Sequence, residues 1–465
     1  MTTNSSFPLT DSGNAERFAR RHGDKVRYCH PWGKWLVWDE KRWKIDDTGA
    51  VNLLVKETVR SIYTEAAGEK DDEKRKKIIA WGRESESAAR RKAMLELAKS
   101  EPPIPILPEV LDEDPCLLNC LNVTIDLRTG KSREHRQGDY ITKLCPVSYD
   151  PDAPCDVWDR FLIRILGGND DLYVFLQRFF GYALTALVIE QILLILYGVG
   201  ANGKSTLLNA YFDMIGPDYA MKAVPDLLLN KKNENHPTER ADLFGKRFVA
   251  AIETDDGRRL AESLVKELTG GDYIRARRMR EDFWQFKPTH KIVLACNHKP
   301  TIRGTDHAIW RRIRLVPFNI IIPDAEQDKQ LPEKLRAELP GILAWCVRGC
   351  LEWQRQGLGV PPEVADATAG YREDQDFLGS FLQECCMVGP EFKVRAGELY
   401  SAYKNYCETS GEFTLSQKRF GAHLTEKGYR KYTSNGVWYE GLGLVLEGTE
   451  GCGRVFPYKQ LSTFS

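Results

Sequence analysis

Three short apolar runs are the first clear feature of the chain, and each ends at a glycine or a polar residue. They are Gln191 to Tyr197, Arg247 to Ile252 and Lys291 to Cys296. Because apolar and polar positions do not alternate within them, the runs are typical of strands buried on both faces of a parallel sheet. Segments with helical spacing separate the runs. The pattern therefore predicts a helix-covered α/β domain over residues 191–320.

Helical patterns lie on both sides of this domain. Apolar spacing from Val157 to Leu187 predicts a helical lead-in over 151–190. The same spacing after Leu331 predicts a helical lid over 321–370.

The first 150 residues combine strand and helix patterns. Alternating aromatic and polar residues at 26–46 predict a β-hairpin that turns at Asp39-Glu40. Charged amphipathic helices are expected at 51–100, and residues 117–131 have the pattern of a strand and a turn. We interpret residues 1–150 as a mixed α/β domain, to which these patterns assign no chemistry.

The C-terminal region, residues 371–465, has a different order of elements. Two helices are predicted at Val394 to Tyr406 and Ser416 to Lys427, followed by strands around Ser434-Asn435-Gly436. Asn-Gly is a strong hairpin signal. Two helices followed by a two-stranded wing are typical of a winged-helix domain, in which Lys418 on the second helix is the candidate DNA contact. A module that contacts protein is the alternative.

Composition narrows the function classes only slightly. The 66 Lys and Arg residues balance the 66 Asp and Glu residues, so any surface for nucleic acid must come from local clustering. No run of about 18 apolar residues or more predicts a membrane span, and the polar N-terminus lacks a signal peptide. We therefore expect a cytoplasmic protein. The twelve cysteines include no C-x-x-C pair, which favours reduced, buried thiols over a zinc site.

Residues 198–205, GVGANGKS, match the phosphate-binding pattern G-x-x-x-x-G-K-[ST] in full. The match follows an apolar run and precedes a helical segment, which is the arrangement that phosphate binding requires. Backbone N–H groups at the turn and the helix N-terminus attract phosphates, a lysine neutralises them, and a hydroxyl ligates Mg²⁺. We therefore predict a site for ATP and Mg²⁺. The candidate nucleotide-binding residues are Gly198, Gly200, Asn202, Gly203, Lys204, Ser205 and Thr206.

Polar residues end the other two apolar runs. Glu253 closes RFVAAIE, and Asp255 and Asp256 follow it. A carboxylate at this place can ligate Mg²⁺ together with Ser205, or orient the attacking water, and the sequence does not separate these roles. Asn297 ends the third run, where a neutral amide can contact the γ-phosphate or the water. Glu253, Asp255 and Asn297 are therefore candidates for catalysis or metal binding.

Two arginine clusters need anionic partners. In the segment WRRIR, Arg312 can stabilise transition-state charge in a neighbouring subunit's site, although ion pairs within the fold are the alternative. The second cluster lies between Glu253 and Asn297, where the sequence has the pattern of a hairpin. Arg277, Arg278 and Arg280 lie at or near the tip of this hairpin. Closely spaced cations repel one another, so a polyanion is their natural partner. We predict that this hairpin binds DNA.

These motifs, in this order and at this close spacing, resemble the superfamily 3 helicases. These are a compact AAA+ branch that includes the primase-helicases of poxviruses, phages and plasmids. The resemblance implies an AAA+ P-loop ATPase core, flanked by a mixed α/β N-terminal domain and a C-terminal winged-helix domain. It further implies a hexameric ring with ATP held between subunits. No primase motif is evident, so the chain resembles the helicase part alone, and a separate primase or polymerase becomes an expected partner.

The resemblance also implies roles for the candidate residues. Lys204, Ser205 and Thr206 would hold phosphates and metal. Glu253 would be the acid of the second strand and Asn297 the first sensor, while Arg312 would enter the next subunit's site. The hairpin over 277–280 would line a central channel and move single-stranded DNA.

The function expected from all of this is an ATP-dependent DNA helicase. It would translocate on single-stranded DNA as a ring and act on forked DNA during phage, virus or plasmid replication, in the host cytoplasm. The alternative is a non-translocating AAA+ ATPase that loads or remodels a protein partner. A small-molecule kinase is disfavoured, because it has no evident use for a trans-acting arginine or a basic hairpin.

Overall fold

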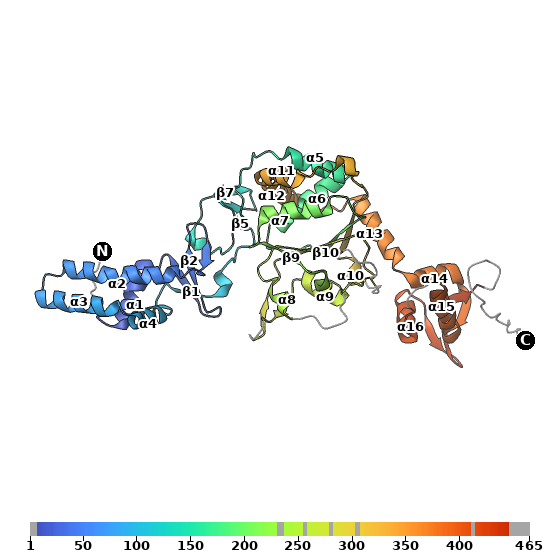
Figure 1. The fold of residues 1–465 in the computed structure, drawn as a ribbon. Helices are drawn as coiled ribbons and strands as arrows, with labels where there is room; N and C mark the ends of the chain where they lie inside the picture. Colours follow the sequence, from blue (N-terminus) through green and yellow to red (C-terminus); the bar gives the residue numbers. More distant parts are fainter. Residues whose placement is uncertain are drawn as a thin grey trace, which may run out of the picture.

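A computed structural model describes residues 7–229, 237–253, 258–278, 282–302, 307–410 and 414–445. Three lobes follow one another in chain order (Figure 1). The N-terminal lobe is mainly helical, the central lobe is built on a parallel sheet, and the C-terminal lobe is small and mixed. No helix within the described ranges combines the length and the apolar character that crossing a membrane requires.

The central sheet has five strands, all parallel, in the order β14-β8-β13-β10-β9. The three predicted strands are confirmed, and they occupy its middle. In chain order the strands are β8 (Leu193–Tyr197), β9 (Ala220–Ala223), β10 (Phe248–Glu253), β13 (Lys291–Cys296) and β14 (Ile313–Pro317). Because β13 lies between β8 and β10, the carboxyl ends of the three strands that carry the predicted site are neighbours.

Helices cover both faces of this sheet (Figure 1). Helices α5, α6, α7, α11 and α12 lie over one face, with α8, α9, α10 and the hairpin β11–β12 over the other. On the first face they span Asp156–Ile165, Asp170–Ala183, Lys204–Ile215, Leu331–Ala337 and Leu339–Gln356. On the second face they span Pro237–Ala241, Glu262–Thr269, His307–Trp310, Ile274–Ala276 and Trp284–Phe286. The predicted helical lead-in and the predicted basic hairpin are confirmed as elements.

His290, directly before β13, is a buried group that makes stability depend on pH. It is 1% exposed, and burial lowers its pKa from 6.5 to about 4. The unfolded chain takes up this proton below pH 6.5 while the folded chain stays neutral, so folding stability falls as the pH drops through this window. We expect His290 to account for about 3 kcal/mol of lost stability by pH 4. Denaturant unfolding of wild type and His290→Leu at pH 7 and pH 4 measures this, with His30→Gln, an exposed histidine, as the control.

The N-terminal lobe pairs helices with a small sheet of order β3-β2-β1-β4. Its helices are α1 (Asp11–His22), α2 (Ala50–Gly68), α3 (Asp72–Ser85) and α4 (Ala88–Ala98). Its strands are β1 (Val26–Cys29), β2 (Lys34–Trp38), β3 (Trp43–Ile45) and β4 (Pro105–Ile106). The predicted turn at Asp39-Glu40 is confirmed. A second turn, which uses the positive φ of Gly33, divides the predicted hairpin region into three strands.

The segment after β4 packs against the central lobe. Strands β5 (Leu117–Asn119), β6 (Thr124–Asp126) and β7 (Lys131–Arg133) form a three-stranded antiparallel sheet. Leu118, Ile125 and Cys145 belong to the same buried cluster as Leu208 and Tyr211 of α7. In the described part of the chain the connections also contain the 3-10 turns Pro108–Val110, Gln137–Asp139, Pro225–Leu227 and Asp324–Glu326.

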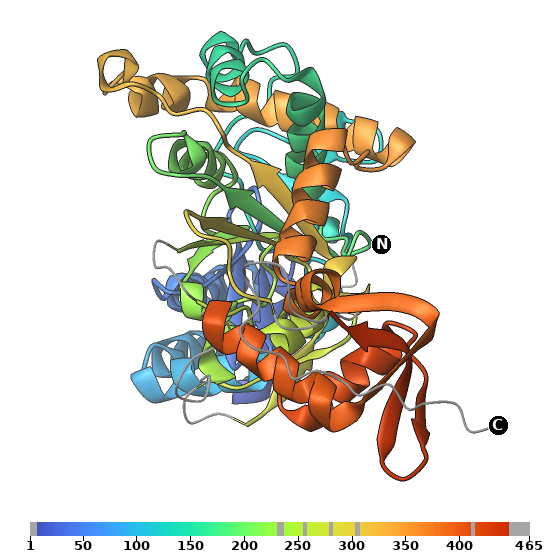
Figure 2. The same ribbon diagram turned by 90° about the vertical axis from the view of Figure 1, so that its right-hand side faces the viewer.

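Helix α13 (Pro362–Asp374) packs against β14 and leads from α12 into the C-terminal lobe (Figure 2). That lobe contains α14 (Phe377–Cys385), β15 (Cys386–Arg395), α15 (Ala396–Ser410), α16 (Gln417–Glu426), β16 (Lys431–Thr433) and β17 (Val437–Leu444). The two predicted helices and the hairpin around Asn435-Gly436 are confirmed as elements. The sequence did not predict β15, which pairs with β17.

The cysteines follow the expectation only in part. Ten of them are buried and are thiols rather than disulfides: Cys29, Cys116, Cys120, Cys145, Cys155, Cys296, Cys346, Cys350, Cys386 and Cys407. Cys385 is disulfide-bonded, so the prediction of reduced thiols is wrong at that position.

Candidate nucleotide site and DNA-contacting surfaces

The predicted phosphate loop joins the carboxyl end of β8 to the first turn of α7. Gly198, Ala201 and Gly203 all have positive φ, at 158°, 59° and 82°. A Cβ at Gly198 would lie 2.3 Å from the Phe318 carbonyl oxygen, and one at Gly203 would lie 2.6 Å from the Ile165 side chain. The loop therefore packs tightly against the end of β14 and against α5.

Two glycines of the loop are not equivalent, which gives a matched test. At Gly200 a Cβ meets nothing within 4 Å, unlike at Gly198. We expect Gly198→Ala to lose about 1–3 kcal/mol of unfolding free energy, whereas Gly200→Ala stays within about 0.5 kcal/mol of wild type. Denaturant unfolding without nucleotide measures both. Equal losses would contradict the described loop geometry.

Lys204 lies at the centre of the candidate site. Its side chain is buried, and its ammonium donates to the carbonyl of Gly198 at 2.5 Å and to the side-chain oxygens of Asn202 at 3.0 Å and Asn297 at 3.4 Å. Burial lowers the pKa of this amine, because the charged form has lost water. An anionic ligand beside the ammonium would offset that cost, so the surroundings fit a phosphate group.

Asn202 stabilises the loop conformation and is also a candidate nucleotide ligand. It is 3% exposed, and its amide donates to the carbonyls of Val199 and Phe318, the latter at 3.4 Å. Ser205 is exposed and Thr206 half-buried in the first turn of α7. Their hydroxyl-bearing side chains therefore belong to the same helix end as Lys204.

Glu253 ends β10 beside the other two strand ends. The register pairs Glu253 with Cys296, and Cys296 with Tyr197. The Glu253 carboxylate, Asn297 and the loop therefore lie side by side at the carboxyl end of the sheet. Glu253 is 5% exposed, and its carboxylate lies 3.8 Å from the Arg258 guanidinium. Between these strands, burial raises the pKa of the Cys296 thiol to about 12, which keeps it neutral. Asp255, the other metal candidate, lies outside the described residues.

Arg312 lies at the opposite end of the sheet, where the strands begin. Its carbonyl accepts from the Leu193 amide at the start of β8, whereas the loop begins after the other end of that strand. At about 3.3 Å per residue, the five-residue strand separates the two by roughly 17 Å. Arg312 is buried and donates to the Ala308 carbonyl at 2.6 Å, while Arg311 beside it is exposed. The fold does not bring Arg312 to its own chain's loop.

The basic hairpin presents one buried and one exposed face. Ile274, Ala276 and Phe286 are buried in the core below the sheet. On the exposed face, Arg275 and Arg277 lie over the ring of Phe283, at 4.4 and 4.8 Å from its centroid. Arg278 is exposed, and Arg280 lies outside the described residues.

Sequence reasoning missed Phe283 and Arg275 in this surface. The signal was present, because alternation places Arg275 and Arg277 on the side opposite to Ile274 and Ala276. Phe283 is 46% exposed. The hairpin face therefore combines cations with an accessible ring.

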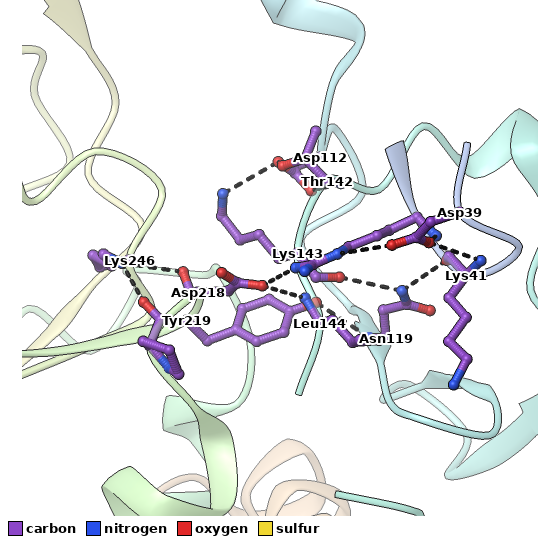
Figure 3. Close-up of polar contacts among 12 residues, drawn as sticks. Asp39, Lys41, Asp112, Asn119, Thr142, Lys143, Leu144, Asp218, Tyr219 and Lys246 are labelled. Carbon is purple, nitrogen blue, oxygen red and sulfur yellow. Dashed lines mark hydrogen bonds and ion pairs between the residues drawn. The ribbon is translucent and has the colours of Figure 1, made fainter. Parts of the chain in front are cut away.

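Polar contacts attach the elements of the site to the N-terminal side of the chain (Figure 3). Asp218, just after α7, forms an ion pair with Arg42 and accepts from the Leu144 amide at 3.0 Å. The next residue, Tyr219, accepts the Asn119 amide at 3.2 Å. Lys246, before β10, donates to the Asp218 carbonyl at 3.4 Å. These contacts join the C-terminal end of α7 and the N-terminal end of β10 to the N-terminal part of the chain, at the ends opposite to Lys204 and Glu253.

The Asp112-Glu113-Asp114 segment contributes to the same region. Asp112 accepts from the Thr142 amide at 2.8 Å and lies 3.3 Å from the Lys143 ammonium (Figure 3). Asp114 pairs with Arg128 at 2.6 Å. These carboxylates brace the loops between the small sheets. An aromatic contact also links the N-terminal sheet to the hairpin, because Phe244 lies 6.3 Å from Trp32 and 5.0 Å from Trp284.

Lys418, the remaining DNA candidate, lies far from this site in the chain. It is exposed in the first turn of α16, next to the equally exposed Arg419. The apolar face of α16 packs inward through Phe420 and Leu424, so the two cations point away from the core of the lobe.

Comparisons with known proteins agree with the arrangement of motifs. Residues 15–167 match the family described as D5 N terminal like, and residues 196–312 match a family of unknown function. A "putative helicase" of Acanthamoeba polyphaga mimivirus is 27% identical over 300 residues, which cover 58% of this chain and 31% of that protein. A "putative helicase" of Invertebrate iridescent virus 3 is 25% identical over 342 residues, covering 64% and 35%. These matches support a likeness to the D5-type primase-helicases.

A further viral relative and a solved structure extend the comparison. A "putative primase" of African swine fever virus is 27% identical over 328 residues, covering 64% of this chain and 34% of that protein. The matched region is thus about a third of the length of these relatives. Among solved structures, the apo C-terminal region of NrS-1 matches with a TM-score of 0.52 and 11% identity, covering 92% of this chain and 98% of that one. This likeness concerns the fold alone.

Proposed function

We propose that this chain is an ATP-driven DNA helicase acting in viral, phage or plasmid DNA replication. The observation that carries the proposal is the carboxyl end of the parallel sheet, where the loop after β8 leads to Lys204, Glu253 ends β10 and Asn297 follows β13. A buried ammonium, a carboxylate and a neutral amide are the groups that phosphoryl transfer to water requires. The names of the viral relatives, helicase and primase, support a role in replication.

The residues present fit ATP with Mg²⁺. Lys204 now donates to three oxygens of the protein itself, and phosphate oxygens would take their place. In the proposal Gly198, Gly200, Asn202 and Gly203 shape the loop, and Ser205, Glu253 and Asp255 hold the metal. The bound metal would supply charge stabilisation to the reacting phosphate. Asn297, already 3.4 Å from Lys204, would contact the γ-phosphate or the water.

The position of Arg312 supports an assembly. Arg312 lies at the end of the sheet opposite to Lys204. It can therefore act on a nucleotide only in another copy of the chain. We propose a ring, with six subunits as the resemblance implies, in which each nucleotide lies between an AAA+ core and the arginine edge of its neighbour. Arg312 is the residue that the resemblance assigns, and Arg311 is the more accessible of the two.

The hairpin is the proposed contact for single-stranded DNA. Arg277, Arg278 and Arg280 would contact phosphates, and the exposed ring of Phe283 would stack on a base. The packing of Phe286 and Trp284 against the core would couple the hairpin to the nucleotide edge. The C-terminal lobe, proposed as a winged helix, would add contacts through Lys418. A separately encoded primase or polymerase is the proposed protein partner.

Phe283 provides a test of this DNA contact. We expect Phe283→Ala to weaken binding of single-stranded DNA about tenfold, because one stacking contact is lost. Phe283→Tyr should keep near-normal affinity, since the ring remains. Fluorescence anisotropy with a labelled oligothymidylate measures both. If alanine and tyrosine have the same affinity as wild type, the ring does not contact DNA.

The experiment that tests the proposed function is ATP hydrolysis with and without single-stranded DNA. We expect DNA to raise the rate several-fold in wild type and to leave it unchanged when Arg277 and Arg278 are both alanine. The unstimulated rate of this double variant is the control that the nucleotide site remains intact. Hydrolysis indifferent to DNA would instead favour a loader or a remodeller of a protein partner.

A further inference from the structure

The sheet of the C-terminal lobe has one face without a covering element among the described residues. Its other face, which includes Val394, Tyr439 and Leu442, is buried in the core formed with the helices of this lobe. On the open face the register places Arg395 and Tyr432 on either side of Trp438. Cross-strand neighbours point to the same side of a sheet, so these three side chains form one row.

Cations accompany both rings of this face. The Arg395 guanidinium lies 5.2 Å from the centroid of the Trp438 ring, and the Lys393 ammonium lies 5.6 Å from that of Tyr432. The Trp438 indole also donates to the Ser434 carbonyl at 2.9 Å, which fixes the ring over the hairpin. Both rings are only half-buried, so part of each remains accessible to a ligand.

A second row beside the first adds positive charge. Lys393 and Arg430 lie 3.9 and 3.7 Å from the two oxygens of Glu440. The side chains of Lys393 and Arg430 are 53% and 80% exposed, so neither cation is screened from a larger ligand. In these two rows Lys393, Arg395 and Arg430 face one carboxylate, which leaves the surface net positive.

We propose that this open face is a second binding platform for single-stranded nucleic acid, separate from the β11–β12 hairpin. Trp438 and Tyr432 would stack on unpaired bases, while Lys393, Arg395 and Arg430 would contact the backbone phosphates. Bases in a duplex are stacked on each other and cannot lie flat on these rings, so the platform selects single strands. Binding here needs neither ATP nor the hairpin, so it goes beyond the proposed motor function.

The test uses the full chain without nucleotide, carrying Phe283→Ala to weaken the hairpin contact. In this background we expect Trp438→Ala to reduce affinity for labelled oligothymidylate about tenfold, and Trp438→Phe to restore most of it. Arg395→Ala should weaken binding. It should also make the affinity depend less steeply on salt concentration, since it removes a phosphate contact. Lys404→Ala, an exposed cation on α15, is the matched control and should bind as the background does.

Unchanged affinity in Trp438→Ala, with unchanged thermal unfolding, would overturn the platform. An equal loss of affinity for single-stranded and duplex DNA would overturn its selectivity for single strands. Failure of DNA to stimulate ATP hydrolysis would count against the motor function but not against this platform, because the binding assay contains no ATP.

Discussion

Lys204→Ala is expected to lower ATP hydrolysis by at least about 10³-fold, with or without DNA. The reason is the position of its ammonium, buried and surrounded by the loop carbonyl of Gly198 and two side-chain amide oxygens. Alanine places no charge there, so transition-state charge on the phosphates goes unmatched. A phosphate-release assay under saturating ATP measures the loss.

A second substitution separates chemistry from folding at the same place. Lys204→Arg keeps the positive charge but changes the reach and the geometry of its donors, so we expect it to bind nucleotide while hydrolysing it poorly. Both variants should unfold at a temperature close to that of wild type. Hydrolysis within tenfold of wild type in Lys204→Ala would show that this loop is not the catalytic site.

Arg312→Ala is expected to reduce hydrolysis on the order of 10³-fold, although its side chain lies at the edge of the sheet away from Lys204. Activity should return when this variant is mixed with Lys204→Ala subunits. Some interfaces would then combine an intact loop from one subunit with an intact arginine from the other. Titrating one inactive variant into the other at fixed total protein, with hydrolysis as the readout, measures the recovery.

Arg311→Ala is the matched control for this experiment, because it removes the neighbouring, more exposed arginine. We expect it to lose less activity than Arg312→Ala. Mass photometry of the mixture establishes that subunits exchange, and thermal unfolding establishes that Arg312→Ala is folded. A mixture that forms mixed assemblies without recovering activity would contradict action between subunits.

The sequence predicts the centre of the main sheet better than its edges. Strands β8, β10 and β13 are apolar except at their terminal residues, because both of their faces are covered. The edge strands β9 and β14 were not predicted, because a cation interrupts the apolar run of each. These cations are Lys222 in β9 and Arg314 in β14. An edge strand can keep such a side chain partly in water. Similarly, Gly389-Pro390 within β15 has the pattern of a break, yet β15 accommodates it in an irregular edge.

The candidate site is predictable where it depends on strand ends, and unpredictable where it depends on packing. Lys204, Glu253 and Asn297 follow apolar runs, and parallel strands bring such positions together. The burial of Arg312 and the exposure of Arg311 depend on how α10 packs, which no local pattern encodes. The pairing of Arg275 and Arg277 with Phe283 depends likewise on the register across the hairpin.

The central claim is that ATP hydrolysis at the Lys204 loop drives separation of DNA strands. Displacement of a labelled strand from a forked duplex, compared between wild type and Lys204→Ala, tests this claim most directly. The account predicts displacement by wild type only when ATP and Mg²⁺ are present, and none by Lys204→Ala at equal DNA occupancy. Equal displacement by the two proteins, or none by a wild type that hydrolyses ATP and binds the fork, would contradict it.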